Sequence, residues 1–486
     1  MIIFQILLYV SLQFHQPQGA KLTGSQHIVF PAMLESRSDN GGKVLKITED
    51  LTLNLEKSSI LSKNFLLRTY EDRIMKHSYH DGEILEQDLY HDISHWASVM
   101  VSEDNGLQVE GVLGPNLRIK PLTDERSVEG RTAHILYEFS DDTDSHGANI
   151  GVHWNNQGNI SERDDKTGGA NAEARPEVLV AVDSTFRSQF RSVLTLLRYV
   201  IIVINSVNVR YMTVRDIRVQ LKFQALEIFD EYTEVFLHRV DRLLAGYRSL
   251  ETFREYVERN PQKYQLYDAV YLVTGLDMAQ YNGYRWDLTL MGIAYVAGAC
   301  TNRKVGIGED KVGTFFGVRI AAHEVGHLLG CPHDGQSYGS YSSVHCPWGD
   351  GFIMSYRVED SNSMKFSSCC QDNIRRFVHY GAGTCLLRQG MKRTIKKGNF
   401  TKELPGTLVK ELCKAAFPEV SETYLLEEGK RECQGRCHMP NHVWRLGYKT
   451  TVFPDNTRCS QENKPKICIN GECTPTKPRY SSYRAY

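Results

Sequence analysis

Ala321-Ala-His-Glu-Val-Gly-His-Leu-Leu-Gly-Cys-Pro-His-Asp334 is the stretch that decides the fold of this 486-residue chain. His323 and His327 are four residues apart, so on a helix both imidazoles project from one face and can bind a single metal ion. Glu324 flanks the same face, where a carboxylate can accept a proton from a metal-activated water. The stretch therefore predicts a helix with two metal ligands and a general base.

A third histidine follows this predicted helix. Gly330 can adopt the positive φ of a helix C-terminus, and Pro332 cannot continue the helix. The chain therefore turns, and His333 can become the third nitrogen ligand. Three protein ligands leave one position open for water or a peptide carbonyl, which is typical of a catalytic zinc site rather than a structural one. The similar pair at 91–95 lacks a glutamate and a third ligand, so we interpret it as ordinary surface or hydrogen-bonded histidines.

The segment Gly351-Phe-Ile-Met-Ser-Tyr356 lies about twenty residues beyond the third histidine. A tight turn that carries Met354 would place a soft, apolar thioether beneath the three imidazoles. An isolated methionine is usually a core residue. Its distance from the histidine motif favours the role of a floor under the metal site.

The first twenty residues are typical of a secretory signal peptide, because an apolar stretch is followed by a polar segment that ends in small residues. A buried N-terminal helix or strand is the alternative, but no basic flank or stop-transfer pattern follows. The sequons at Asn159 and Asn399 are glycosylation candidates, which are usable only on the secretory route. We therefore expect a secreted, extracellular protein.

The cysteines favour the same compartment. They form two sets of six, which fits three disulfides in each of two modules in an oxidising environment. Each set allows 15 pairings, so spacing alone does not give the connectivity. The sets are Cys300, Cys331, Cys346, Cys369, Cys370 and Cys385, then Cys413, Cys433, Cys437, Cys459, Cys468 and Cys473.

The rest of the chain divides by its patterns. Residues 21–139 contain alternating stretches, such as 134–139, that predict strands. Residues 140–173 are rich in Asp, Asn, Gly and Ser, which indicates an exposed linker where proteases cut. The following part predicts an α/β domain that ends near Cys385, and the chain from 391 onward is typical of a small disulfide-rich module. The α/β predictions are strands at 177–182, 219–223 and 269–273 and helices at 187–208 and 249–259.

Composition excludes several classes of protein. The 57 Lys and Arg balance the 58 Asp and Glu, so nothing indicates the basic face of a nucleic-acid binder. The 10% aromatic share argues against general disorder. The mean hydropathy of -0.38 argues against a polytopic membrane protein, and the internal apolar run at 199–207 is far shorter than the ~20 residues of a span.

The histidine motif and Met354 together resemble the metzincin zinc endopeptidases. Asp334, directly after the third histidine, is similar to the reprolysin (adamalysin) branch of that family. Nearly the whole chain shares the resemblance, which looks most like the secreted salivary metalloproteases of ticks. The matching segments are 78–83 and 106–122 for a propeptide, 267–277 and 292–300 for the strands beside the substrate, and 404–406, 453–459 and 467–473 for a Cys-rich region of the ADAMTS group.

The resemblance implies an α/β metzincin catalytic domain, with a twisted mixed sheet, an active-site helix and a Met-turn. A β-rich propeptide would precede this domain and a small disulfide-rich module would follow it. The expected boundaries are a signal peptide at 1–20, a propeptide at 21–173 with an acidic and Gly-rich linker from about 140, a reprolysin-type zinc protease domain at 174–390, and a Cys-rich ADAMTS-like module with a flexible tail at 391–486.

The resemblance also implies roles for single residues. His323, His327 and His333 would hold one catalytic Zn2+, and Glu324 would be the general base, with Gly330, Asp334 and Met354 in support. Tyr356 stands where the astacin branch carries a tyrosine that touches zinc, so it could hydrogen-bond the tetrahedral intermediate; a packed aromatic beneath the site is the alternative.

A calcium site and three disulfides follow from the same resemblance. The family's Ca2+ site maps onto Glu177, Asp268 and the carbonyl of Cys385, although Arg388 replaces the usual asparagine, which speaks against calcium. The implied disulfide is Cys300–Cys385. Vicinal Cys369 and Cys370 would be strained if joined to each other, so Cys331 and Cys346 would take one each.

The propeptide departs from the family in its latency device. Reprolysin propeptides place a cysteine thiolate on the zinc, but no cysteine precedes Cys300. Latency must therefore be steric, or use a carboxylate or histidine, or be weak. No dibasic processing site lies near the linker, and Arg175 is a candidate for the maturation site.

We therefore expect a secreted, monomeric zinc metalloendopeptidase that cleaves extracellular proteins. The resemblance implies substrates such as fibrinogen, fibrin or matrix proteins and an anti-haemostatic effect. One alternative is a non-catalytic metalloprotease-like binding protein that acts through the Cys-rich module. A structural zinc protein is a second alternative, but no fourth ligand is evident.

Overall fold

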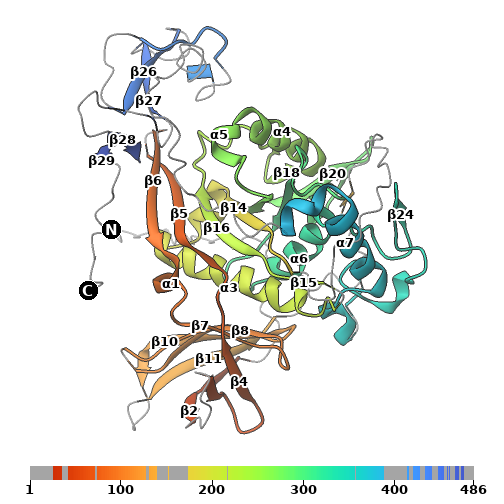
Figure 1. The fold of residues 1–486 in the computed structure, drawn as a ribbon. Helices are drawn as coiled ribbons and strands as arrows, with labels where there is room; N and C mark the ends of the chain where they lie inside the picture. Colours follow the sequence, from red (N-terminus) through yellow and green to blue (C-terminus); the bar gives the residue numbers. More distant parts are fainter. Residues whose placement is uncertain are drawn as a thin grey trace, which may run out of the picture.

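Two large β-sheets form the framework of the structure, which is a computed structural model (Figure 1). The signal peptide, both sequons, Tyr356, Arg388 and the C-terminal tail lie outside the described residues. The described residues are 26–34, 42–71, 74–104, 106–126, 131–139, 151–152, 173–215, 217–355, 357–358, 360–387, 413–414, 420–426, 433–440, 447–453, 457, 459, 466–469 and 472–475.

A nine-stranded antiparallel sheet is built by the N-terminal region, in the order β1-β11-β10-β9-β8-β7-β4-β3-β2. The strands predicted for this region are therefore confirmed. One face buries an apolar cluster that includes Leu45, Leu53, Val99 and Val109. The strands are β1 (Gln26–Val29), β2 (Ala32–Leu34), β3 (Lys43–Lys46), β4 (Thr52–Lys57), β7 (Leu89–Asp92), β8 (Ala97–Ser102), β9 (Gln108–Leu113), β10 (Leu117–Arg126) and β11 (Thr132–Glu138).

The eight-stranded sheet has the order β12-β22-β23-β19-β14-β16-β5-β6. Its five central strands, from β23 to β5, are parallel, and β22 runs antiparallel to β23. Two strands of the N-terminal region, β5 and β6, extend this sheet on one side (Figure 1). The strands are β5 (Leu61–Glu71), β6 (Ile74–Asp81), β12 (Gly151–Val152), β14 (Glu177–Val182), β16 (Lys222–Ile228), β19 (Ala269–Thr274), β22 (Gly292–Ala294) and β23 (Val305–Glu309).

The predicted strand at 177–182 is confirmed by β14, but two other predicted elements have different bounds. The helix predicted at 187–208 is present mainly as α3, but it begins later than predicted: α2 ends at Ser188, and α3 starts after Ser192, whose side chain forms a capping box with that of Thr195. The strand predicted at 219–223 is also interrupted, and β16 begins only at Lys222. The helices are α1 (Gly82–Leu85), α2 (Ser184–Ser188), α3 (Val193–Tyr211), α4 (Gly246–Arg259), α5 (Pro261–Tyr264), α6 (Gly317–Leu328) and α7 (Ser368–Tyr380).

Helix α3 lies between the two sheets and packs against α6, β7, β8 and β9. Its residues from Tyr199 to Tyr211 are all buried. By length and composition alone α3 could cross a membrane, but most of it is buried inside this protein. Its apolar sequence is therefore accounted for by packing, since both faces of the helix meet protein.

Short elements and six disulfides complete the described part of the chain. The disulfides are Cys300–Cys385, Cys331–Cys370, Cys346–Cys369, Cys413–Cys437, Cys433–Cys468 and Cys459–Cys473, so none joins one set of six to the other. The short elements are β13 (Glu173–Ala174), β15 (Arg218–Val219), β17 (Arg239–Val240), β18 (Leu243–Ala245), β20 (Asp277–Tyr281), β21 (Trp286–Asp287), β24 (Ser337–Tyr338), β25 (Tyr341–Ser342), β26 (Gln434–His438), β27 (Tyr448–Val452), β28 (Lys466–Ile469), β29 (Glu472–Pro475) and the 3-10 turns at 348–350, 361–364 and 382–387.

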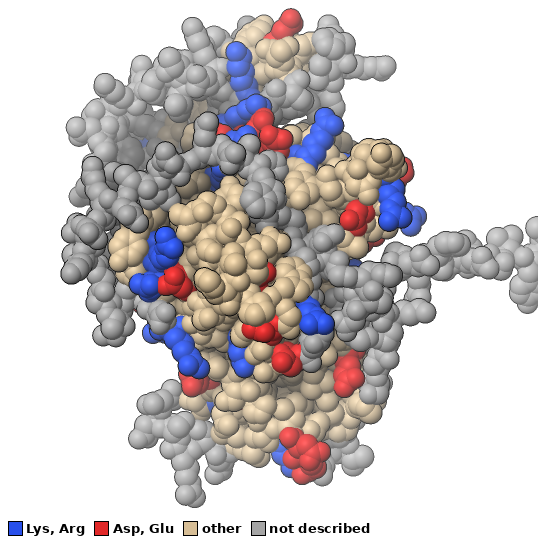
Figure 2. Space-filling model, turned by 90° about the vertical axis from the view of Figure 1, so that its right-hand side faces the viewer, with Lys and Arg blue, Asp and Glu red and all other residues tan. Residues whose placement is uncertain are grey.

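Surface charge follows the balanced composition. On the face drawn in Figure 2, the Lys and Arg side chains of the described residues are interspersed with those of Asp and Glu. Neither sign gathers over one element of that face.

Asp310 holds the start of α6. Its Oδ1 accepts the backbone N–H of Gly317, the first residue of α6, at 2.9 Å, and its Oδ2 accepts the hydroxyl of Tyr199 from α3 at 3.0 Å. Burial raises the pKa of Asp310 to about 6, although these hydrogen bonds oppose the shift. Asp310 therefore links α3 to α6, and its contribution to the free energy of unfolding depends on pH.

Replacing Asp310 by asparagine tests this dependence on pH. Between about pH 4 and pH 6 the folded protein binds more protons at Asp310 than the unfolded chain, so wild-type stability falls as pH rises through this window. The amide does not titrate, so the stability of Asp310→Asn relative to wild type should rise by up to about 3 kcal/mol across the window and then level off. Urea unfolding at a series of pH values measures the difference.

The exposed Asp277 supplies the control for this comparison. Asp277→Asn should show a difference from wild type that changes little with pH. A difference between Asp310→Asn and wild type that is equally flat from pH 4 to pH 7 would contradict the assigned role of Asp310.

Candidate metal centre and active site

Helix α6 carries two of the three predicted metal ligands. All of its residues from Ile320 to Leu328 are buried, and it packs against α3, β22 and β23. The hydroxyl of Tyr211, from α3, donates to the carbonyl of Ala322 at 3.0 Å. The backbone beside His323 is thereby fixed from the interior.

The chain turns after α6 as the glycine predicted. Gly330 has a φ of +101°, and its N–H donates to the carbonyl of His327 at 2.9 Å. A Cβ at Gly330 would lie 3.0 Å from the Cβ of Phe377, so the position has neither the conformation nor the room for a side chain. The Cys331–Cys370 disulfide then ties the turn to α7. The turn returns the chain so that His333 faces α6.

The three predicted ligands converge on one point. The Nε2 atoms of His323 and His327 lie 3.0 Å apart, those of His327 and His333 lie 3.1 Å apart, and those of His333 and His323 lie 3.2 Å apart. Two of the rings are also held from behind by backbone carbonyls. The Nδ1 of His323 lies 2.7 Å from the carbonyl oxygen of Ile353, and the Nδ1 of His327 lies 2.6 Å from that of Cys331.

The hydrogen bonds to these carbonyls fix the tautomers. A carbonyl oxygen only accepts, so the Nδ1 atoms of His323 and His327 carry the protons and their Nε2 lone pairs point inward. Burial, followed by the neighbouring imidazoles, lowers the pKa of both residues well below the ordinary value. Burial lowers the pKa of His333 to about 4. All three imidazoles are therefore neutral near pH 7, as metal ligation requires.

The donor set fits a zinc ion. Two nitrogens that bind one tetrahedral zinc ion at about 2.0–2.1 Å lie roughly 3.3 Å apart, and the three observed separations are close to this value. The three imidazoles also form a group that could hold a metal ion by proximity alone. No side chain among the described residues joins them as a fourth ligand in that group.

Glu324 is a buried carboxylate without a protein partner. It is fully buried, and neither oxygen has a hydrogen-bond partner among the described residues. Burial raises its pKa well above the ordinary value of a glutamate. A buried polar group without a partner is costly to fold. Such a group is expected where it serves chemistry rather than stability.

Gly292 makes room for this carboxylate, which the sequence did not indicate. A Cβ on Gly292, the first residue of β22, would lie 2.6 Å from Oε1 of Glu324 and 2.7 Å from Cγ2 of Ile320. The bare backbone of β22 therefore lies directly against the general-base candidate. The signal in the sequence is a lone glycine at the start of a strand, which marks a close approach.

Met354 and Asp334 support the site from below. Met354 is fully buried, and a Cβ on Gly326 of α6 would lie 2.9 Å from its Sδ. The N–H of Asp334 donates to the carbonyl of Met354 at 3.1 Å. The Oδ1 of Asp334 accepts the hydroxyl of Ser367, the N-cap of α7, at 2.6 Å. Asp334 thus joins the segment after His333 to the Met354 turn and to α7.

The predicted calcium residues lie together, but their groups are engaged with the protein. The Oδ2 of Asp268 accepts the backbone N–H of Glu177 at 2.9 Å. Asp268 also lies near the Cys300–Cys385 disulfide and the ammonium of Lys304. Lys304 in turn donates to the carbonyls of Tyr264 and Tyr267 at 2.8 and 2.6 Å. A cationic side chain beside Asp268 does not favour a divalent cation there.

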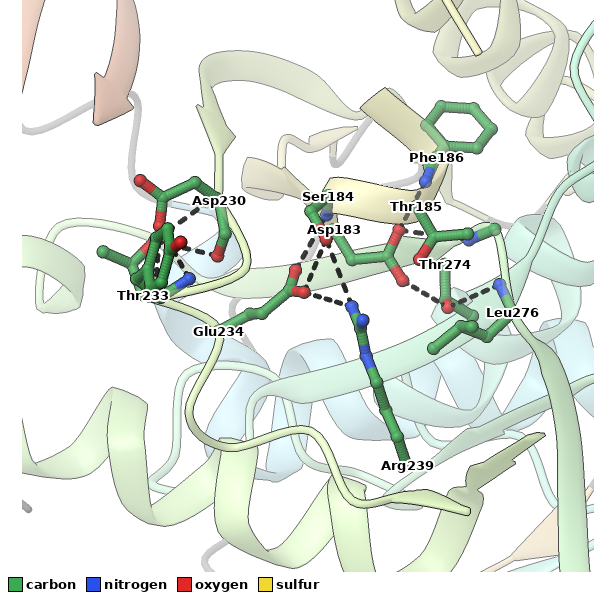
Figure 3. Close-up of polar contacts among 12 residues, drawn as sticks. Asp183, Ser184, Thr185, Phe186, Asp230, Thr233, Glu234, Arg239, Thr274 and Leu276 are labelled. Carbon is green, nitrogen blue, oxygen red and sulfur yellow. Dashed lines mark hydrogen bonds and ion pairs between the residues drawn. The ribbon is translucent and has the colours of Figure 1, made fainter. Parts of the chain in front are cut away.

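A second polar cluster lies at the carboxyl ends of β14 and β19 (Figure 3). Asp183 caps α2 by accepting the N–H of Phe186 at 2.7 Å and accepts the hydroxyl of Thr274 at 2.6 Å. Glu234 accepts both the N–H and the hydroxyl of Ser184 and contacts Arg239. These carboxylates are satisfied by the protein, so the cluster is a structural junction.

Strand β22 is the predicted strand beside the substrate, and it borders the site. It lies on the outer side of β23, and the linker strand β12 pairs with it in parallel, Gly151 opposite Ile293 and Val152 opposite Ala294. Thus two linker residues lie along the backbone of the strand that approaches Glu324.

Known proteins resemble the chain in the region that forms this site. Residues 173–367 match a family model, Reprolysin_5, described as metallo-peptidase family M12. Venom metalloproteinase antarease-like TtrivMP_A of Tityus trivittatus is 28% identical over 391 residues, which are 76% of this chain and 94% of that protein. Venom metalloproteinase antarease TserMP_A of Tityus serrulatus is 28% identical over the same shares. An ADAMTS-like protein of Bombyx mori is 29% identical over 61% of this chain and 44% of that protein.

The fold and the site define a metallopeptidase domain with mixed sheets and several disulfides. Residues 173–367 form a metallo-peptidase family M12 domain of the reprolysin type, which supports the predicted metalloendopeptidase. The three histidines fit the zinc ion that such enzymes use.

A side chain at Gly292 should displace Glu324 without touching the histidines. Gly292→Ala should lower kcat for a fluorogenic peptide by about ten- to a hundredfold, because a misplacement of about 1 Å can cost that much. Zinc content, measured by mass spectrometry, should stay at one per chain. Gly349→Ala is the control, because its Cβ would meet nothing closer than 3.4 Å. Full turnover in Gly292→Ala would show that Glu324 does not need this space.

Proposed function

We propose that this chain is the secreted precursor of a zinc metalloendopeptidase that hydrolyses peptide bonds in extracellular proteins, with Glu324 as the general base. The observation that carries the proposal is the geometry of the site. Three neutral imidazoles converge on one point, and an unpartnered carboxylate lies on the same helix. A structural zinc site would need a fourth protein ligand and no such base.

Zinc held by His323, His327 and His333 would supply Lewis acidity, which polarises the scissile carbonyl and acidifies a water. Glu324 takes a proton from the attacking water and then delivers it to the amine that leaves. Burial raises the pKa of Glu324 above the ordinary value of a glutamate, which makes its carboxylate a stronger proton acceptor. The Ile353 and Cys331 carbonyls hold two imidazoles in the ligating tautomer.

Substrate would bind as an added strand on β22. On the side away from β23, β22 pairs with only the two residues of β12, and an extended peptide that replaced β12 there would pass over Gly292, next to Glu324. Met354 would be the floor of a Met-turn. Tyr356 would hydrogen-bond the tetrahedral intermediate.

The pairing of β12 with β22 supports a steric form of latency. Residues 151–152 take the place on β22 that a substrate would need, and no propeptide cysteine is required. The earlier choice of Arg175 as the processing site is not supported, because its N–H donates to Leu386 at 2.9 Å and the preceding Ala174 is fully buried in β13. We propose that processing falls within residues 153–172.

The remaining parts are assigned by the same proposal. They are a signal peptide at 1–20, a propeptide at 21–173, a zinc protease domain at 174–390 and a Cys-rich module at 391–486 that binds substrate outside the active site. Two relatives are named venom metalloproteinases, which supports secretion. Fibrinogen, fibrin and matrix proteins are the proposed substrates, and the chain would act as a monomer.

Removing the carboxylate of Glu324 should abolish turnover without loss of zinc. Glu324→Ala should lower kcat by roughly a hundredfold or more, in line with the usual contribution of a general base, and should bind one zinc per chain with an unchanged melting temperature or a higher one. The exposed Glu231 provides the control variant Glu231→Ala, which should keep full turnover. Retained turnover in Glu324→Ala would remove this residue from the mechanism.

Metal removal separates the enzyme from a non-catalytic binding protein. Dialysis against 1,10-phenanthroline should abolish peptide hydrolysis and any effect on fibrinogen, and one equivalent of zinc should restore both. In His327→Ala zinc should restore neither, because a ligand is missing. A biological effect that survives chelation would favour binding through the Cys-rich module.

A further inference from the structure

The N-terminal region is built into the eight-stranded sheet rather than laid on its surface. Strand β5, eleven residues long, pairs in parallel with β16, with Leu66 opposite Ala225 and Arg68 opposite Glu227. Phe65 and Phe223 are fully buried, and their rings meet edge-on at 4.9 Å between centroids. Figure 1 shows β5 and β6 standing beside β16. Without β5, β16 would be an edge strand with an exposed apolar face.

A buried ion pair crosses this junction. Nη1 of Arg68 lies 2.8 Å from Oε2 of Glu227, with the two side chains 3% and 0% exposed. The hydroxyl of Tyr70, also from β5, donates to Oε1 of Glu227 at 2.6 Å, and Tyr264 donates to Oε2 at 2.8 Å. Burial alone would raise the pKa of Glu227, but Arg68 and these hydroxyls outweigh it, and the pKa is lowered. Loss of β5 would remove both Arg68 and Tyr70 from Glu227, and breaking a buried ion pair in this way is strongly unfavourable.

Helix α3 supplies a second junction. Asn205 donates to the hydroxyl of Ser98 on β8 at 2.9 Å and to the carbonyl of Tyr90 on β7 at 3.3 Å. Ser98 in turn donates to the carbonyl of Ile202 at 3.3 Å. These four residues are buried. The nine-stranded sheet therefore packs on α3 through buried apolar side chains and through the hydrogen bonds of Asn205 and Ser98.

The loop before α6 supplies a third junction. Nε of Arg118, on β10, donates to the carbonyl of Thr314 at 2.7 Å, and the hydroxyl of Tyr137, on β11, donates to that of Gly313 at 2.6 Å. Phe139 meets Phe316 edge-on at 5.8 Å between centroids. The N-terminal region thus holds the segment that leads into the active-site helix.

We infer that the N-terminal region stays bound after the linker is cut, so that the processed protein is a non-covalent complex of two chains. The contact between β12 and β22, beside the active site, is much smaller than the three buried junctions. Strand β12 pairs with β22 at only two positions, whereas β5, α3 and the loop before α6 make buried contacts. A cut beyond residue 152 lets the two-residue strand leave β22 while the rest remains. No disulfide can contribute, because no cysteine precedes Cys300.

The test uses the full chain with a tobacco etch virus protease site inserted between Lys166 and Thr167, in the Glu324→Ala background to prevent self-cleavage. The inserted site makes the outcome independent of whether the proposed reaction is correct. After cleavage, a denaturing gel should show two fragments, and gel filtration at 0.15 M NaCl should show both in one peak at the volume of the uncut chain. Separate elution of the N-terminal fragment overturns the inference.

A pair of variants tests the ion pair at the junction. In the cleaved protein, Glu227→Gln should release a tagged N-terminal fragment at least tenfold faster in biolayer interferometry, because Arg68 loses its charged partner. Glu255→Gln, which removes a surface carboxylate paired with Arg259, should leave the rate unchanged. Equal release rates for the two variants would contradict the role of Glu227. If Glu227→Gln does not fold, the gel filtration of the cleaved parent still decides the inference.

Discussion

Three neutral imidazole nitrogens held 3.0–3.2 Å apart are the constraint on which the rest of the structure depends. The Nδ1–H groups of His323 and His327 donate to carbonyl oxygens behind the rings, so their Nε2 lone pairs face inward and cannot hydrogen-bond one another. A cation at the point of convergence resolves this. The packing of α6, the positive φ of Gly330 and the Cys331–Cys370 disulfide all serve to keep the three rings in register.

The second constraint is the surroundings of the carboxylate on the same helix. Glu324 is buried without a partner, and the bare backbone at Gly292 lies against it. In the proposed mechanism, this arrangement would bring a substrate peptide on β22, the proton acceptor Glu324 and the metal ligands close together. The N-terminal region reaches the same place twice, through β12 on β22 and through Arg118 on the loop before α6. The N-terminal part of the chain therefore contacts the protease domain at two segments that lie next to the active site, β22 and the loop before α6.

The sequence predicted the histidine site because its geometry is local. Residues four apart on a helix share a face, and a glycine followed by a proline ends that helix, so His323, His327, Gly330 and His333 could be placed without tertiary information. Contacts between distant segments could not be predicted in this way. Nothing in the N-terminal pattern says that β5 pairs with β16, because an alternating strand does not specify its partner. Apolar periodicity joined two helices into one, because it does not register the hydrogen bonds of the capping box at Ser192 that begin the second helix. Arg175 was chosen by residue type, and its place beside buried Ala174 depends on contact with Leu386.

The central property of this site is the metal that it binds and the ligands that hold this metal. X-ray absorption at the zinc edge of the purified, processed protein reports the atoms bound to zinc. The structure predicts one zinc per chain with a first shell of three imidazole nitrogens and one oxygen at about 2.0–2.1 Å. A shell that contains sulfur, a fourth imidazole, or no zinc at all in folded protein would contradict the central claim.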